Sequence, residues 1–257
     1  MATLPELQTR RAAECRLTPD RALASPDDAE EFLRDRGFLT RTPDSALPSF
    51  FEACHEEPYR AGAAGFGSWP ATKWPWFEEI AARPGVYALK IHRGKHVLLT
   101  DETAALADPI LRSELARMHA ADPGWALVLD QLASAGPSTP EDLCTELGLR
   151  PKELKDLRSP LERCGAVVTH MVVVELAGGG HEHVSELTRW DHAYSEPSGR
   201  GGIDDLLVTA VRAAVVAPER EVPRWFSWRW LIPDRSVDRL VAEGRLERPE
   251  PGWVTAT

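Results

Sequence analysis

The sequence predicts a mainly helical protein with small β-hairpins, built from tandem winged-helix modules. Short amphipathic helical stretches alternate with brief β-branched runs, and glycine or proline separates them. The order of three helices followed by a hairpin is clearest between residues 125 and 190. With 257 residues, the chain has room for one large domain or for two to three small ones.

Residues 1–120 are expected to form an N-terminal module of helices and one hairpin. Ser25 and Gly37 frame the clearest helix of this module, as an N-terminal cap and a C-terminal stop. The predicted elements are two helices at 27–36 and 49–57 and two paired strands at 86–91 and 96–100. Helices followed by a hairpin would fit a divergent winged helix with a loop inserted at 59–69.

Residues 121–194 are predicted to form a winged-helix domain. Apolar residues at helical spacing predict its helices, and the β-branched run after Gly165 predicts a strand. The predicted elements are helices at 125–135, 140–147 and 151–164, then strands at 167–176 and 181–188, with a glycine turn at 178–180. Pro160 is compatible with a bend or a break in the third helix. In helix-turn-helix proteins the third helix of such a unit enters a DNA groove, and the hairpin is the wing.

A linker rich in glycine and serine at 195–202 is expected to join this domain to a second winged-helix domain at 203–257. The predicted elements are a long helix at 203–214, an aromatic segment at 225–230, a helix at 233–243 and a hairpin formed by 245–247 and 253–255. The tryptophans of this segment and of residues 69–76 could stack on unpaired bases. Packing between modules is the interpretation we favour.

The composition indicates a globular, cytoplasmic protein without a metal or cofactor. The sequence contains no apolar run long enough to span a membrane and no secretory signal pattern. Its four cysteines are scattered without a Cys-x-x-Cys pair, which disfavours a zinc site or a disulfide framework. Motifs for phosphate-binding glycine loops, serine hydrolases and zinc proteases are missing. The net charge of −10 disfavours non-specific coating of nucleic acid, but it permits a local basic face.

The predicted third helix of the central domain carries the first candidates for DNA contact. These basic residues are Arg150, Lys152, Lys155 and Arg158. With the leucines of the helix facing inward, Lys155 and Arg158 point outward together, and Lys152 lies on the same side. Cations on such a helix can reach phosphates or guanine edges. A solvated face of mixed charge is the alternative.

Two hairpins supply further candidates. Lys90, Arg93 and Lys95 make the first hairpin basic, so that it could contact a phosphate backbone or form a solvated turn. His181 and His183 alternate along the predicted wing and share one face, where they could meet DNA. A metal held by this histidine pair would need a third ligand from elsewhere, so no metal site is assigned.

Three features resemble the AlkZ/YcaQ-type winged-helix family, and in particular its AlkZ-related branch. They are the segment Phe32-Leu33-Arg34-Asp35-Arg36-Gly37-Phe38-Leu39, the central unit ending in Arg189-Trp190-Asp191, and the C-terminal unit. The family includes DNA glycosylases that release alkylated bases and unhook interstrand crosslinks. The resemblance covers most of the chain loosely, and it implies three winged helices in tandem and a connection to DNA.

The resemblance also locates the family's catalytic motif. In the active glycosylases the Gly-φ-Leu segment runs into Gln-x-Gln or Gln-x-Asp, which positions the hydrolytic water. In this sequence Thr40 and Thr42 occupy those two positions, and hydroxyls lack both a carboxylate's basicity and an amide's paired hydrogen-bonding groups. Asp44 is a weak candidate because it is out of register. No catalytic residue is therefore assigned.

Three functions remain open from the sequence. The working hypothesis is a non-catalytic protein that binds double-stranded DNA through tandem winged helices. The first alternative is a base-excision glycosylase for alkylated or crosslinked DNA with a divergent active site. The second is a scaffold that binds protein partners, which the acidic net charge keeps open.

Overall fold

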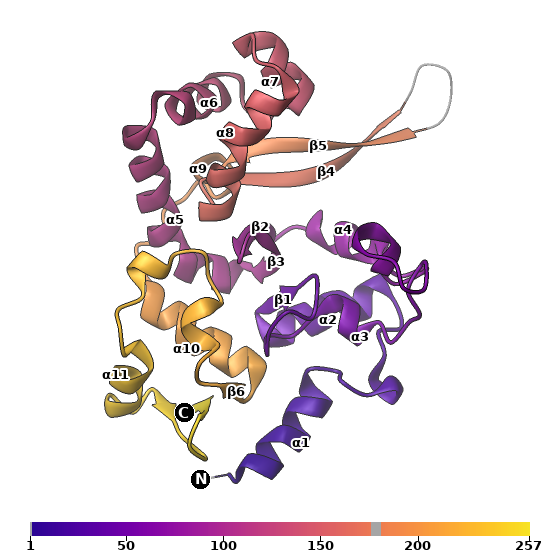
Figure 1. The fold of residues 1–257 in the computed structure, drawn as a ribbon, viewed down its shortest axis with the longest axis vertical. Coiled ribbons are helices and arrows are strands. Elements are labelled where there is room, and N and C mark those ends of the chain that lie inside the picture. Colours follow the sequence, from indigo (N-terminus) through magenta and orange to yellow (C-terminus); the bar gives the residue numbers. More distant parts are fainter. Residues whose placement is uncertain (1, 176–180) are drawn as a thin grey trace.

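The computed structural model of the chain describes residues 2–175 and 181–257. For residues 173–175 and 181–183 it describes the backbone alone. Helices and small antiparallel sheets make up the fold (Figure 1), which confirms the prediction of a mainly helical protein with small β-hairpins. The predicted turn at 178–180 lies outside the described residues. No helix in the described part of the chain is both long and apolar enough to cross a membrane.

The N-terminal part combines helices with a three-stranded sheet. Its elements are α1 (Leu4–Glu14), a helical turn at Pro19–Arg21, α2 (Pro26–Arg36), β1 (Phe38–Thr40), α3 (Phe50–Ala53), a second turn at Gly65–Ser68, α4 (Pro75–Ala81), β2 (Val86–His92) and β3 (Lys95–Thr100). The sheet is antiparallel in the order β1-β3-β2. Helix α3 ends at Ala53 and is therefore shorter than the helix predicted over 49–57.

Local capping explains the start and end of α2. The Ser25 hydroxyl accepts a hydrogen bond from the backbone N–H of Asp28, which caps the first turn. Gly37 ends the helix in the left-handed region, with a φ of 74°. A Cβ at this glycine would lie 2.7 Å from the Thr103 hydroxyl, so only glycine allows β1 to follow the helix so closely.

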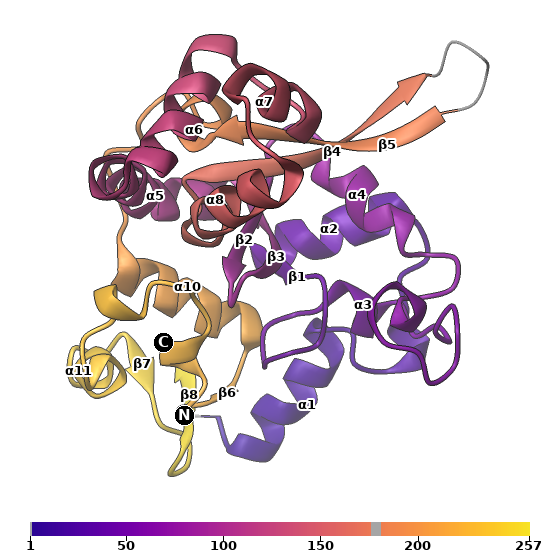
Figure 2. The same cartoon turned by 45° about the horizontal axis from the view of Figure 1, so that its top comes forward.

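The central part contains the longest helix and the longest hairpin. Its elements are α5 (Asp101–Ala121), α6 (Pro123–Ala135), α7 (Pro140–Leu147), α8 (Pro151–Cys164), β4 (Val167–Glu175), β5 (His181–Arg189) and α9 (Trp190–Ala193). Helix α8 runs through Pro160 without a break. In both views the β4–β5 hairpin projects away from the helices, beyond α4 (Figures 1 and 2).

The C-terminal part is a small helical unit with a short sheet. Its elements are α10 (Ile203–Ala214), β6 (Ala217–Pro218), helical turns at Val222–Arg224 and Arg229–Leu231, α11 (Ser236–Ala242), β7 (Leu246–Glu247) and β8 (Trp253–Ala256). The strands pair in the order β6-β8-β7. Helix α11 starts three residues after the predicted position at 233. The division of the chain into separate winged-helix domains stays a prediction.

Helix α5 connects the three parts. It packs against α6, α8, α10 and the strands β2 and β3. The carboxylate of Asp108, which is 1% exposed, accepts hydrogen bonds from the Trp190 indole N–H (2.8 Å), the Ser198 backbone N–H (2.9 Å) and the Arg112 side chain (2.8 Å). A Cβ at Gly201 would lie 2.5 Å from the Leu106 backbone. The segment 195–202 is thus docked on α5 and does not act as a free linker.

The tryptophans mostly support the packing interpretation. Trp190, Trp225 and Trp228 are fully buried, and the Trp228 indole N–H donates to the Cys164 carbonyl (2.9 Å). Trp69, Trp74 and Trp76 are half-buried, and the first two pack against Phe66. Trp230 is 57% exposed.

Candidate nucleic-acid interface

Helix α8 exposes its N-terminal half. Leu154 and Leu161 are buried against the rest of the module, whereas Arg150, Lys152 and Lys155 are exposed. Proline at the first helical position and a bond from the Arg150 backbone N–H to the Glu153 carboxylate (2.9 Å) start the helix. Three of the four predicted contact residues, Arg150, Lys152 and Lys155, therefore face solvent, and their contact with DNA stays a prediction.

Acids on the same helix partly neutralise this face. Arg150 pairs with Glu153 (2.5 Å), and Lys152 lies 3.4 Å from the Asp156 carboxylate. Both pairs are highly exposed, so each contributes little stability and can be exchanged for another anion. Among the described residues Lys155 has no ion-pair partner.

Arg158 is less accessible than its neighbours on α8. Its side chain is half-buried, and its Nη1 atom has no hydrogen-bond partner among the described residues. Together with Lys155 it lines a cavity of about 380 Å³ between α7 and α8. An unsatisfied guanidinium nitrogen in a cavity wall is a donor for an anionic ligand.

The C-terminal half of α8 lies against the N-terminal sheet. Glu162 is 4% exposed and accepts hydrogen bonds from the Lys90 ammonium (2.8 Å) and the Thr169 hydroxyl (2.5 Å). Lys90 was expected among the DNA contacts. It instead holds strand β2 to helix α8, so its charge is used within the fold.

The other two basic side chains of the β2–β3 hairpin also bind within the protein. Arg93 donates to the backbone carbonyls of Arg224 (3.0 Å) and Asp44 (2.9 Å). The Lys95 ammonium pairs with the Asp44 carboxylate at 2.6 Å. Both side chains remain exposed on their outer sides. The tip of the hairpin thus ties the segment after β1 to the C-terminal unit.

The segment that corresponds to the family's catalytic motif offers no free base. Thr40 is 1% exposed, and its hydroxyl donates to the Pro48 carbonyl (2.9 Å). The Thr42 hydroxyl donates to the Asp44 carboxylate. Burial alone would raise the pKa of Asp44, but the hydrogen bonds from Lys95 and Thr42 outweigh it and hold that pKa below its usual value. A carboxylate held ionised in this way accepts a proton poorly, which makes it a weak general base.

The predicted contacts on the wing fall at the limit of the described residues. His181 and His183 pair through their backbones with Glu175 and Val173, and their side chains lie outside the described residues. Within the described part of the chain, no three histidine, cysteine or acidic side chains come together as metal ligands.

Sequence reasoning missed a cluster of arginines near the hairpin tip. A cavity of about 460 Å³ is lined by Asp44, Arg93, Arg220, Glu221, Arg224 and Arg229. Arg220, Arg224 and Arg229 lie within ten residues of one another, in and just before the aromatic segment at 225–230. This spacing could have indicated a local basic cluster from the sequence. The contribution of Arg93, from a distant hairpin, becomes visible only in the fold.

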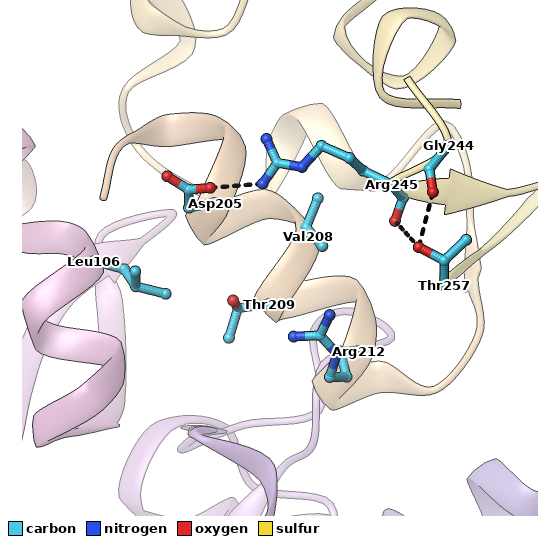
Figure 3. Close-up of a pocket in the computed structure, with 8 residues that line it drawn as sticks. All are labelled: Leu106, Asp205, Val208, Thr209, Arg212, Gly244, Arg245 and Thr257. Carbon is cyan, nitrogen blue, oxygen red and sulfur yellow. Dashed lines mark hydrogen bonds and ion pairs between the residues drawn. The ribbon is translucent and has the colours of Figure 1, made fainter. Parts of the chain in front are cut away.

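Internal contacts pair most of the polar groups that line a further cavity, beside α10. It has a volume of about 330 Å³ and lies between α5, α10 and the C-terminal residues (Figure 3). Arg245 pairs with Asp205 at 2.6 Å, and the Thr257 hydroxyl donates to the Gly244 carbonyl at 2.9 Å. Arg212 also lines this cavity and has no ion pair among the described residues. Since most of its polar groups are paired, this cavity does not indicate a ligand.

Comparison with known proteins supports the resemblance seen in the sequence. No protein-family model matches the chain, and no curated protein matches it. Among solved structures, it is similar to the Streptomyces sahachiroi DNA glycosylase AlkZ, with a TM-score of 0.57 and 13% sequence identity. The match covers 100% of this chain and 70% of that structure. The chain therefore has an AlkZ-like fold along its whole length.

Proposed function

We propose that the chain binds double-stranded DNA through the exposed half of α8 and does not catalyse base excision. The observation that carries the proposal is the exposure of Lys152 and Lys155 on the third helix of a three-helix-and-hairpin unit. That position is the one from which helix-turn-helix proteins reach a DNA groove. The similar solved structure is itself described as a DNA glycosylase, which favours a DNA ligand over a protein ligand.

The state of the motif segment supports a non-catalytic role. Base excision needs a group that positions and activates water. The Thr40 hydroxyl is buried and bonded to the backbone, and Asp44 is bonded to Lys95 and Thr42. None of these groups is placed to take a proton from a water molecule at neutral pH.

Binding is tested by fluorescence anisotropy with a labelled duplex at low salt. We expect the double substitution Lys152→Gln/Lys155→Gln to weaken binding by roughly tenfold, because two phosphate contacts are lost. Arg21→Gln is the matched control, because Arg21 is exposed and has no ion pair among the described residues. Equal affinity of the wild type and the double variant would remove α8 from the interface. No binding by the wild type would favour a scaffold for protein partners.

Catalysis is tested by incubating the wild type with a duplex that contains N7-methylguanine and measuring base release. We expect no release above the spontaneous rate. Release that disappears in Asp44→Asn would contradict the proposal and establish a glycosylase with a divergent active site. Release that persists in Asp44→Asn would also contradict it and would exclude Asp44 as the base.

A further inference from the structure

The arginine cavity lies where three distant segments meet. Arg93 comes from the turn between β2 and β3, Asp44 from the segment after β1, and Arg220, Arg224 and Arg229 from the C-terminal unit. These three C-terminal arginines are exposed, whereas Val222 and Trp225, between and beside them in sequence, are fully buried. Burial of the intervening residues fixes the segment and directs the arginines outward into one cavity.

The charges in this cavity are unbalanced. The Asp44 carboxylate is bound by Lys95 and Thr42, and the Glu221 carboxylate accepts from the Ala46 backbone N–H at 2.9 Å. In the described part of the chain, no carboxylate pairs with the guanidinium groups of the three C-terminal arginines. Four positive and two negative side chains thus line one cavity, in a protein whose net charge is −10.

Arg93 keeps these groups together. Its turn adopts the left-handed region, with a φ of 53°, and its side chain donates to the Arg224 and Asp44 carbonyls. The hydroxyl and backbone N–H of Ser227 also donate to the Ile91 carbonyl, at 3.1 and 2.9 Å. The walls of the cavity are therefore preorganised, and like charges are held close before any ligand arrives. An anion with several acceptor oxygens would offset this repulsion.

We propose that this cavity binds a phosphate group of a nucleic-acid strand. Guanidinium groups present planar pairs of donors that match the oxygens of a phosphate, and several of them can share one phosphate. The identity of the strand rests on the proposed function, whereas the chemistry of the site rests on the cavity itself. The phosphate is either an internal diester or a terminal monoester.

Helix α8 approaches the hairpin turn that contributes Arg93 to the cavity. A Cβ at Gly94, beside Arg93, would lie 3.1 Å from the Arg163 side chain near the end of α8. Lys152, Asp156, Ser159 and Arg163 are spaced to form one stripe along that helix. This stripe ends at Arg163, beside the turn that carries Arg93.

The site is tested first without DNA, using inorganic pyrophosphate as the probe. Arg220→Gln/Arg224→Gln/Arg229→Gln removes the cations and retains Arg93, which holds the walls. Arg212→Gln is the control, because it removes an exposed arginine that lines a different cavity. At constant ionic strength, pyrophosphate should raise the Tm of the wild type and the control but not of the triple variant. An equal Tm rise in all three proteins would overturn the site.

DNA of three kinds then distinguishes the sources of the phosphate. The probes are a 5′-phosphorylated duplex, the same duplex with 5′-hydroxyl ends, and a covalently closed dumbbell. If the phosphate is terminal, the wild type should prefer the phosphorylated duplex by roughly tenfold and the triple variant should lose this preference. If it is internal, the triple variant should bind all three DNAs about tenfold more weakly.

These outcomes separate the site from the proposed function. If pyrophosphate stabilises only proteins with the three arginines but the wild type binds no DNA, the phosphate site stands and the proposed function fails. If the triple variant has the wild-type affinity for every DNA and the wild-type rise in Tm with pyrophosphate, the phosphate site fails. DNA binding through α8 can still stand in that case.

Discussion

The β2–β3 hairpin and helix α8 are both basic in sequence, but the fold uses their charges differently. Lys90 and Lys95 of the hairpin form ion pairs with Glu162 and Asp44, and Arg93 binds backbone carbonyls. On α8, Lys155 has no ion pair among the described residues, and Lys152 has only an exposed one. The hairpin therefore stabilises contacts between segments, whereas α8 presents cations to solvent.

The difference teaches that local charge does not reveal whether a cation is available to a ligand. The acids that pair with Lys90 and Lys95 lie 72 and 51 residues away in the sequence. The acids beside Lys152 and Arg150 lie within one helical turn, and their pairs are solvated. Only the Lys90–Glu162 pair, which is distant in sequence and partly buried, withdraws a cation from the surface.

Breaking the Lys90–Glu162 pair should have the largest effect on stability. Lys90→Ala leaves a buried carboxylate with the Thr169 hydroxyl as its remaining donor, which should cost about 3 kcal/mol of unfolding free energy. Lys155→Ala should change this free energy by less than about 0.5 kcal/mol. Urea denaturation of both variants measures the contrast, and equal midpoints would contradict it.

The hairpin histidines should make stability depend on pH. Burial, together with the charge of Arg41, lowers the pKa of His96 to about 2, and burial lowers that of His92 to about 4. Both are neutral in the folded protein at pH 7, so they add no positive charge to the hairpin. Because an unfolded histidine takes up a proton below about 6.5, stability should fall as the pH drops from 6.5 toward the folded pKa values.

For His96 alone, the loss between pH 7.5 and pH 5 should be on the order of 2 kcal/mol. His96→Phe should remove this share of the pH dependence, because the ring is stacked on Phe77 and its Nδ1 has no partner among the described residues. His119→Gln is the control, since His119 is exposed. Denaturation midpoints across this pH range provide the measurement, and an unchanged slope in His96→Phe would refute the assignment.

Much of the fold could be predicted from local signals. Capping residues and glycine stops located α2, α7 and α8 within one or two residues, and the hairpins followed from β-branched runs. Helix α5 gave no such signal. It is buried on several sides, so its apolar residues do not form one stripe, and its buried Asp108 and internal Pro109 resemble surface and turn residues. The role of Asp108 depends on partners from α9 and residue 198.

The candidate site was predictable only in part. The outward face of α8 follows from helical periodicity, which is local. The arginine cavity depends on Arg93 meeting residues more than a hundred positions later, and no sequence pattern encodes that contact. The engagement of Asp44 by Lys95 likewise comes from tertiary structure.

The central claim is that Lys155 of α8, and not Lys90 of the β2–β3 hairpin, is a DNA-binding cation. The most direct measurement is the salt dependence of duplex binding for Lys155→Gln and Lys90→Gln, each checked for folding by circular dichroism. We predict that Lys155→Gln flattens the log–log slope by roughly 0.9, as one lost phosphate contact requires, while Lys90→Gln leaves the slope unchanged. A flatter slope for Lys90→Gln with no change for Lys155→Gln would contradict the account.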